Sequence, residues 1–135
     1  MRFMMLMIPA GYESAVPGTM PEAAAVAEMM KYNETLQKAG VLLALDGLRP
    51  PSEGARITWP GGKAKVVDGP FTEAKEVLGG YWIIDVKSRD EAIEWAKRCP
   101  GDAKSTIEVR QVQELSDFPP DVQEVAGRLT EMQKR

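Results

Sequence analysis

The sequence contains no histidine and only one cysteine, Cys99. The commonest ligand of transition metals in proteins is therefore missing, and neither an internal disulfide nor a cysteine cage for zinc can form. We expect no metal site and no cofactor. Long apolar runs are also missing, because the stretch from Phe3 to Ile8 is too short to span a bilayer and carries no signal-peptide pattern. The sequence thus predicts a cytoplasmic protein with no membrane partner.

A large excess of one charge is absent as well. The 17 lysines and arginines nearly balance the 20 aspartates and glutamates, giving a net charge of -3 with no block of like charges. A broad cationic surface for a phosphate backbone is not expected, and nucleic acid is not a predicted partner. At 135 residues with 44% hydrophobic side chains, the chain has the size and composition of one domain with a moderate core.

Four apolar segments, at residues 2–8, 41–45, 81–86 and 106–112, predict the strands of one sheet, with 2–8 in its centre and 41–45 buried. Helices are predicted over residues 19–39 and 88–98. Thr19 with Glu22, and Ser88 with Glu91, have the spacing of capping boxes at their starts, and Gly40 is suited to end the first helix.

Residues 55–67 predict an exposed hairpin, because Gly61 and Gly62 can adopt the positive φ of a tight turn. The order of elements predicts an α+β protein with a ferredoxin-like βαββαβ fold and an inserted β-hairpin. We expect this domain to cover residues 1–118. Residues 119–135 are predicted to form an extra C-terminal amphipathic helix. Its apolar positions recur at helical spacing and need a surface to lie on: Val122, Val125, Leu129 and Met132.

Both faces of the predicted sheet carry apolar side chains, yet two helices cover only one face. Segments such as Met4 to Ile8 and Tyr81 to Ile84 are apolar at successive positions, which alternate between the faces. Burial of each large side chain contributes roughly 1.5–3 kcal/mol, and a contiguous exposed patch of them is rare on a monomer. We therefore predict a homodimer built sheet to sheet.

Several motifs together resemble the YCII-related family, in its DGPF-containing branch, over about residues 1–118. They are Asp68-Gly69-Pro70-Phe71 and the following residues to Trp82, Lys31-Tyr32-Asn33-Glu34, Ala39 to Leu42, Gly47 to Ser52, Ile93 to Pro100, and Ile107 to Arg110. The resemblance implies a dimeric α/β barrel. It also implies a cleft for a small acid or lactone with a His-Asp pair, and DGPF relatives are associated with alternative sigma factors. Because this sequence has no histidine, that pair cannot form. The sequence therefore favours a protein without catalysis, and whether it is an enzyme stays an open question at this point.

Polar residues at the ends of predicted strands are the candidates for a ligand-binding site: Asp46, Arg49, Ser52, Arg56 and Asp68. The guanidinium groups of Arg49 and Arg56 could hold a carboxylate or phosphate through paired hydrogen bonds. Two structural alternatives stay open. Arg56 would simply be a solvated hairpin residue, and Asp68 would bond backbone amides of its own turn.

Asn33 is a sixth candidate, because it falls on the same helical stripe as Met29 and Leu36 and a buried amide needs a partner. That partner would be a ligand or a backbone group. The sequence therefore favours a homodimer that binds a small acidic metabolite in a cleft, and this interpretation includes a degenerate lyase or isomerase. The alternative is a regulatory module without catalysis, linked to transcription, which binds a protein partner through the C-terminal helix.

Overall fold

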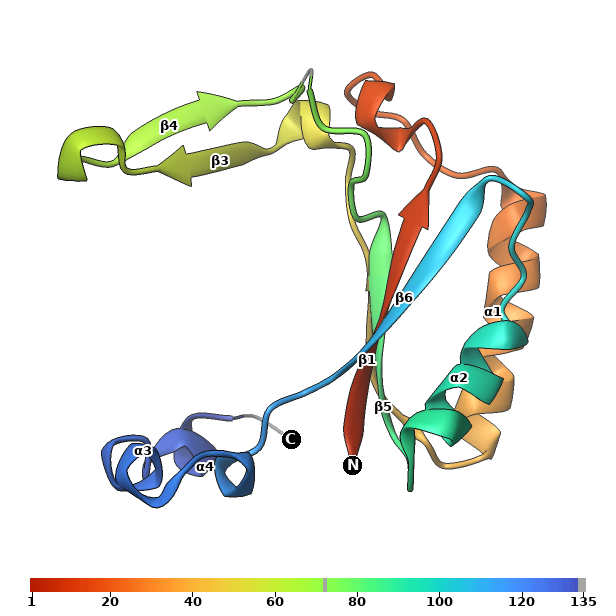
Figure 1. Ribbon diagram of the computed structural model, residues 1–135. Helices are drawn as coiled ribbons and strands as arrows, with labels where there is room; N and C mark the ends of the chain where they lie inside the picture. Colours follow the sequence, from red (N-terminus) through yellow and green to blue (C-terminus); the bar gives the residue numbers. More distant parts are fainter. Residues whose placement is uncertain (72, 134–135) are drawn as a thin grey trace.

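The computed structural model describes residues 1–71 and 73–133 (Figure 1). Thr72, which follows the DGPF motif, and residues 134–135 of the predicted C-terminal extension lie outside the described residues. The chain forms a four-stranded antiparallel sheet in the order β2-β5-β1-β6, built from β1 (Arg2–Pro9), β2 (Leu42–Gly47), β5 (Gly80–Asp85) and β6 (Ser105–Gln111). Met5 lies opposite Trp82 on one side and Val109 on the other. The predicted strands and the central position of β1 are confirmed.

Both long helices, α1 (Ala23–Lys38) and α2 (Arg89–Lys97), cover the same face of the sheet (Figure 1). The core lies between them and the sheet, with Phe3, Met5, Leu36, Trp82 and Ile84 almost completely buried. The rings of Tyr32 and Trp82 meet edge to face at 5.7 Å. The Tyr32 hydroxyl donates a hydrogen bond of 2.7 Å to the carbonyl of Trp95, which satisfies this buried polar group.

The helix caps agree with the prediction at α2 but not at α1. Ser88 accepts a hydrogen bond from the Glu91 amide at 3.1 Å, as a capping serine should. Helix α1 starts at Ala23, four residues later than predicted, and the Thr19 hydroxyl instead donates to the carbonyl of Val16. Pro21 accounts for the difference, because a proline disfavours helical backbone at the residue before it.

Strand β2 is an edge strand rather than the buried strand predicted. The pairing of β2 with β5 is irregular between Leu42 and Ala44, and the side chain between them, Leu43, is 52% exposed. An edge position leaves one side of a strand without neighbouring side chains, so a continuous apolar run is not by itself sufficient for burial.

The predicted hairpin is present and forms a separate two-stranded sheet of β3 (Ala55–Thr58) and β4 (Lys65–Asp68). All residues of both strands are exposed. The 3-10 turn η3 (Pro60–Gly62) joins them, with Gly61 and Gly62 at positive φ. Figure 1 shows the hairpin projecting from the sheet on the side opposite α1 and α2.

The C-terminal segment differs from the prediction of one continuous helix. After the 3-10 turn η4 (Leu115–Asp117), it forms two short helices, α3 (Pro120–Val125) and α4 (Leu129–Met132), which are interrupted near Gly127. Glycine costs about 1 kcal/mol relative to alanine inside a helix, and the segment buries too little surface to offset this. The segment also projects on the side of the sheet opposite α1 and α2 (Figure 1). None of the described helices is both long and apolar enough to cross a membrane.

Candidate functional site

Two hollows meet where β2 ends and β5 begins. Gly47 and Gly79 belong to the lining of both hollows. The larger has a volume of about 600 Å³, and we call it the Arg49 hollow. Its other lining residues include Tyr12, Thr19, Met20, Leu48 and Arg49. The lining is mainly apolar, with one guanidinium group and two hydroxyl groups at its surface. This composition suits a small molecule with an apolar body and one anionic group.

Arg49 is held in place by Glu53 of the 3-10 turn η2 (Pro51–Glu53). Its Nη1 donates to Glu53 Oε1 at 3.0 Å, while Glu53 Oε2 accepts the amide of Gly18 at 2.9 Å. The Arg49 side chain remains 69% exposed. Since a guanidinium has five N–H donors and this pair uses one, Arg49 keeps donors for an anion at the mouth of the hollow.

Tyr12 belongs to the 3-10 turn η1 (Tyr12–Ser14), which lies against η2. Its hydroxyl donates a hydrogen bond to the carbonyl of Leu48. Burial raises the pKa of the Tyr12 phenol, and the nearby Glu53 carboxylate raises it further. At neutral pH this group therefore carries its proton and orients the wall of the hollow rather than acting as a base.

The smaller hollow, of about 180 Å³, includes Asn33, Asp46, Tyr81 and Trp82 among its lining residues, and we call it the Asn33 hollow. Asn33 is buried, at 8% exposure. Its Oδ1 accepts a hydrogen bond of 2.8 Å from the Trp82 indole, and its Nδ2 lies 3.6 Å from the sulfur of Met30. The amide oxygen of Asn33 thus fixes the largest aromatic ring of the core, and its partner is a side chain rather than the expected ligand or backbone group.

Asp46 is the acceptor for Tyr81, whose hydroxyl donates to Asp46 Oδ2 at 2.7 Å. This hydrogen bond is the main cause that raises the pKa of Tyr81, with smaller contributions from partial burial and from the negative charge of Asp46. Tyr81 is therefore protonated at neutral pH. The pair offers a carboxylate and a phenol in fixed geometry, which can bind a hydroxyl or carbonyl group but provides no base comparable to histidine.

The other three candidates lie away from these two hollows. Ser52, on η2, lines a third hollow together with Gly69, Pro70 and Phe71. Arg56, on β3, places its guanidinium 4.1 Å from the centre of the Phe71 ring. The Asp68 carboxylate, at the end of β4, is exposed and has no hydrogen-bond partner among the residues described. The six predicted residues therefore do not converge on one cleft.

The DGPF turn has a clear steric requirement at Gly69. A Cβ atom built at this position would lie 1.8 Å from the carbonyl oxygen of Pro51, closer than any non-bonded contact allows. The Gly69 amide also donates to the carbonyl of Gly54 at 2.9 Å. The turn thus fastens the base of the hairpin to η2 through backbone contacts that only glycine permits.

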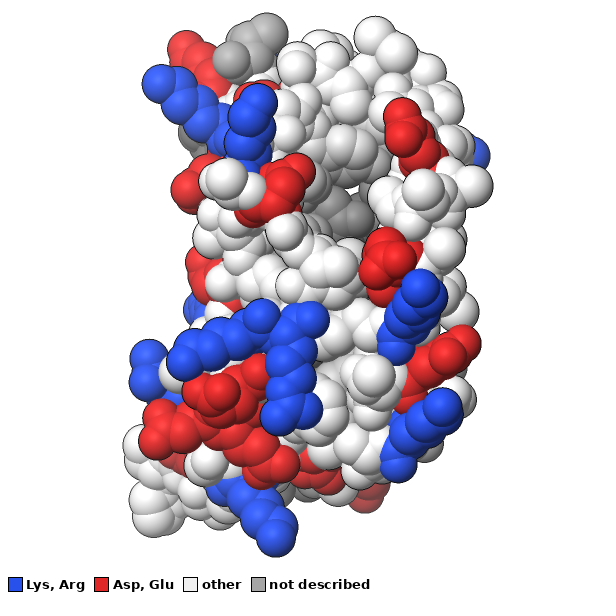
Figure 2. Space-filling model, turned by 90° about the vertical axis from the view of Figure 1, so that its right-hand side faces the viewer, with Lys and Arg blue, Asp and Glu red and all other residues white. Residues whose placement is uncertain are grey.

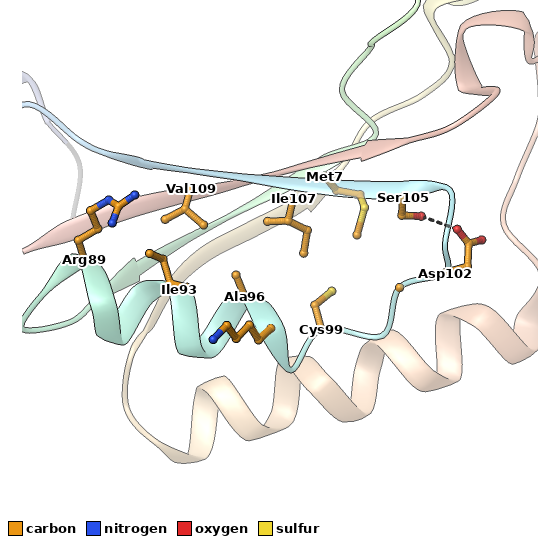
Figure 3. Close-up of a pocket in the computed structure, with 11 residues that line it drawn as sticks. Met7, Arg89, Ile93, Ala96, Cys99, Asp102, Ser105, Ile107 and Val109 are labelled. Carbon is orange, nitrogen blue, oxygen red and sulfur yellow. Dashed lines mark hydrogen bonds between the residues drawn. The ribbon is translucent and has the colours of Figure 1, made fainter.

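Sequence reasoning missed a groove of about 520 Å³ between α2 and the edge strand β6 (Figure 3). Side chains of Ile93 and Ala96 from the helix face Ile107 and Val109 from the strand. Their spacings predict core positions, and no signal in the sequence shows that the edge strand leaves a gap. Arg89 lies at one end of the groove.

Two polar groups of this groove could suggest chemistry, but neither is activated. Burial raises the pKa of the Cys99 thiol to about 11, which keeps it protonated and a poor nucleophile. The Ser105 hydroxyl donates to Asp102 Oδ1 at 3.1 Å, and hydrogen bonds from the Lys104 amide and Ser105 lower the pKa of Asp102. A carboxylate with a lowered pKa is a weak base, so Ser105 has no strong proton acceptor beside it.

Charge on the helical face of the molecule is mixed. Figure 2 shows acidic and basic side chains interspersed there, with no large area of one sign. Within residues 1–71 and 73–133, no group of three or more acidic or cysteine side chains is arranged to hold a metal ion. The Arg49 and Asn33 hollows together offer hydrogen-bonding groups, the guanidinium group of Arg49 and apolar contact.

These features define a small α+β protein in which both long helices cover one face of an antiparallel sheet and a hollow lies at the strand ends. A family model for the YCII-related domain matches residues 1–116, and the chain belongs to this family. It is also similar to the uncharacterized protein R00369 of Rhizobium meliloti (strain 1021), with 40% identity over 60 residues. This similarity covers 44% of the chain and spans about half of the relative, 48% of its length.

Proposed function

We propose that this YCII-related protein is a homodimeric binding protein of the DGPF branch that holds a small acidic metabolite in the Arg49 hollow. The observation that carries the proposal is the Arg49 guanidinium, held by Glu53 at the mouth of a mainly apolar hollow of about 600 Å³ with donors to spare. A carboxylate there would form charge-assisted hydrogen bonds while its apolar part contacts Met20 and Leu48. The proposal concerns binding and includes no catalytic step.

The assembly we propose is a dimeric α/β barrel of two ferredoxin-like domains. The strand order β2-β5-β1-β6, with a helix after β1 and another after β5, supports the ferredoxin-like part. The face of the sheet away from the helices supports the dimer. Because Met5 and Trp82 face the core, the alternating side chains of Met4, Leu6 and Ile83 face the other way, and they are only half-buried.

The binding proposal is tested by calorimetric titration of the whole protein with sodium butyrate, sodium benzoate and inorganic phosphate. We expect a carboxylate to bind and Arg49→Gln to weaken it at least tenfold, because the charge-assisted hydrogen bonds are lost. Arg49→Lys should retain part of the affinity, since the charge stays but the planar fork does not. Arg56→Gln is the matched control and should bind as the wild type does. Equal affinity in Arg49→Gln would reject the Arg49 hollow as the site.

A second candidate function is an interaction with a protein partner through the C-terminal segment. Its apolar residues are exposed in the single chain, with Val125 at 89% and Met132 at 66%. Hydrogen exchange of residues 119–133 in the assembled protein distinguishes packing within the homodimer from binding of another protein. Protection there would mean that the segment packs within the homodimer, and fast exchange would favour a partner of another kind.

A further inference from the structure

The edge strand β6 is regular along its whole length. Residues 105–111 pair with β1 on one side without a shift in register. The other edge of the sheet, β2, has such a shift between Leu42 and Ala44. Irregularities of this kind protect an edge from pairing with another chain. Of the two edges, β6 is therefore the one suited to accept a further strand.

The backbone pattern shows which groups of β6 are free. The Val112 amide donates to the carbonyl of Arg2 at 2.9 Å, one position beyond the last pair of β1 and β6. Hydrogen-bonded pairs alternate with non-bonded pairs in an antiparallel ladder, so residues 106, 108 and 110 bond to β1. The amides and carbonyls of Ile107 and Val109 therefore point away from the sheet, and they have no backbone partner within residues 1–71 and 73–133.

The groove between α2 and β6 lies where the side chains of an added strand would fit. Ile93 and Ala96 of the helix line it together with Ile107 and Val109 of the strand (Figure 3). A strand added beside β6 would place alternate side chains on this face of the sheet and fill the gap under the helix. Free backbone groups and an apolar gap are the two features by which a sheet edge binds an extended strand.

The charges on β6 fit a second copy of the same strand. Glu108 and Arg110 flank Val109 in sequence and lie on the opposite face of the sheet from it. If two β6 strands pair antiparallel with Val109 at the two-fold axis, Glu108 of each copy stands opposite Arg110 of the other. Opposite charges at facing positions stabilise a strand pair. An axis at Glu108 or at Arg110 would instead place like charges opposite each other.

We propose that β6 is a second interface, at which two copies of the chain join edge to edge into one sheet with four strands from each copy. It is separate from the proposed sheet-to-sheet dimer, because it uses the edge of the sheet and leaves the face away from the helices free. A single pair of seven-residue strands makes a small interface, so we expect it at submillimolar rather than micromolar concentration. Arg89 lies at the same end of the groove as Val109, and repulsion between the two copies of Arg89 weakens the contact further (Figure 3).

The test is sedimentation equilibrium of the whole protein from micromolar to submillimolar concentration. The mass of the wild type should double over this range. Glu108→Arg and Arg110→Glu should each weaken the association at least tenfold, because both facing pairs become like charges. An equimolar mixture of these two variants should recover the doubling, since every facing pair between them is again opposite in charge. Glu34→Arg, the same charge change at an exposed position of α1, is the matched control and should behave as the wild type.

Two further measurements locate the contact. Arg89→Gln should tighten the association severalfold, and the amides of Ile107 and Val109 should exchange more slowly at submillimolar concentration. A constant wild-type mass, a doubling retained in Glu108→Arg, a mixture no heavier than its components, or unchanged exchange of these amides would each overturn the proposal. In Ile83→Lys the mass should still double, so failure of the edge contact is distinguishable from failure of the sheet-to-sheet dimer.

Discussion

Two of the polar residues that the sequence singles out are hydrogen-bonded to aromatic side chains of β5. Asn33 accepts from the Trp82 indole, and Asp46 accepts from the Tyr81 hydroxyl. Each of these bonds satisfies a group at the boundary between the core and the strand ends. Arg49 differs from them, because its single bond to Glu53 orients the guanidinium without using all its donors.

Gly69 gives the sharpest prediction for a single residue. In Gly69→Ala the new methyl group would overlap the Pro51 carbonyl, which is backbone and cannot move aside cheaply. Overpacking of this kind costs about 1–3 kcal/mol, and we expect a loss of at least that size in the free energy of unfolding by urea. Gly47→Ala is the control, since a Cβ there meets no atom within 4 Å. Equal stability of the two variants would contradict the steric account of the DGPF turn.

Cys99 predicts a specific dependence of stability on alkaline pH. Its pKa is raised from 9.0 to about 11 by burial, so the unfolded chain loses the thiol proton first. The contribution is fully present below pH 9 and is lost as the pH rises through 11. Between pH 8 and pH 10.5 this group should lower the free energy of unfolding by about 2 kcal/mol.

The measurement is urea unfolding of the wild type and of Cys99→Ala at both pH values. The Tyr12 and Tyr81 contributions are common to both proteins and cancel in the comparison. The pKa of Tyr32 is raised mainly by burial and less by Cys99, so Tyr32 keeps its proton at pH 10.5 in both folded proteins and its contribution cancels as well. The variant should lose about 2 kcal/mol less than the wild type over this interval. An identical loss in both proteins would show that the thiol titrates normally.

At the scale of elements, the cap of α2 makes a quantitative prediction. Ser88 accepts the Glu91 amide, which would otherwise be one of the unpaired donors at the helix start. Ser88→Ala should cost about 1 kcal/mol in the free energy of unfolding, whereas Ser88→Asp should preserve the bond and the stability. Chemical denaturation measures both, and a loss in the Asp variant as large as in the Ala variant would contradict the capping role.

Strands and the second helix were predictable from the sequence because their signals are local and agree with one another. The start of α1 was not predictable in this way. The spacing of Thr19 and Glu22 favoured an early start, whereas Pro21 disfavours helical backbone at residue 20. In the C-terminal segment the apolar spacing favoured one helix, but Gly127 and the lack of a packing surface outweighed it. Local patterns do not show which elements find tertiary partners.

The candidate site was less predictable than the fold, for a geometric reason. Residues at strand ends were expected to meet in one cleft, but Asp46 and Arg49 line two adjacent hollows, while Ser52 lines another. Arg56 lies on an exposed hairpin that forms its own small sheet.

For the whole molecule, two projecting segments lie on the same side of the sheet. The hairpin and the C-terminal helices both extend away from the face that α1 and α2 leave open (Figure 1). Each exposes apolar side chains, among them Ile57 and Trp59 on or beside β3 and Val125 on α3. An open apolar face with apolar segments at both ends is the shape expected of a surface that receives a second copy of the chain.

Ile83 tests this assembly directly. It lies between Met4 of β1 and Ala44 of β2, on the face of the sheet away from the helices. Sedimentation velocity at micromolar concentration should give twice the mass of one chain for the wild type. Ile83→Lys should give a single chain, because a lysine charge cannot be buried unpaired in the centre of an interface. Val26→Lys, at a position 42% exposed on α1, is the control and should remain dimeric. A wild type that sediments as one chain would reject the dimer, and a dimeric Ile83→Lys variant would place the interface on another surface.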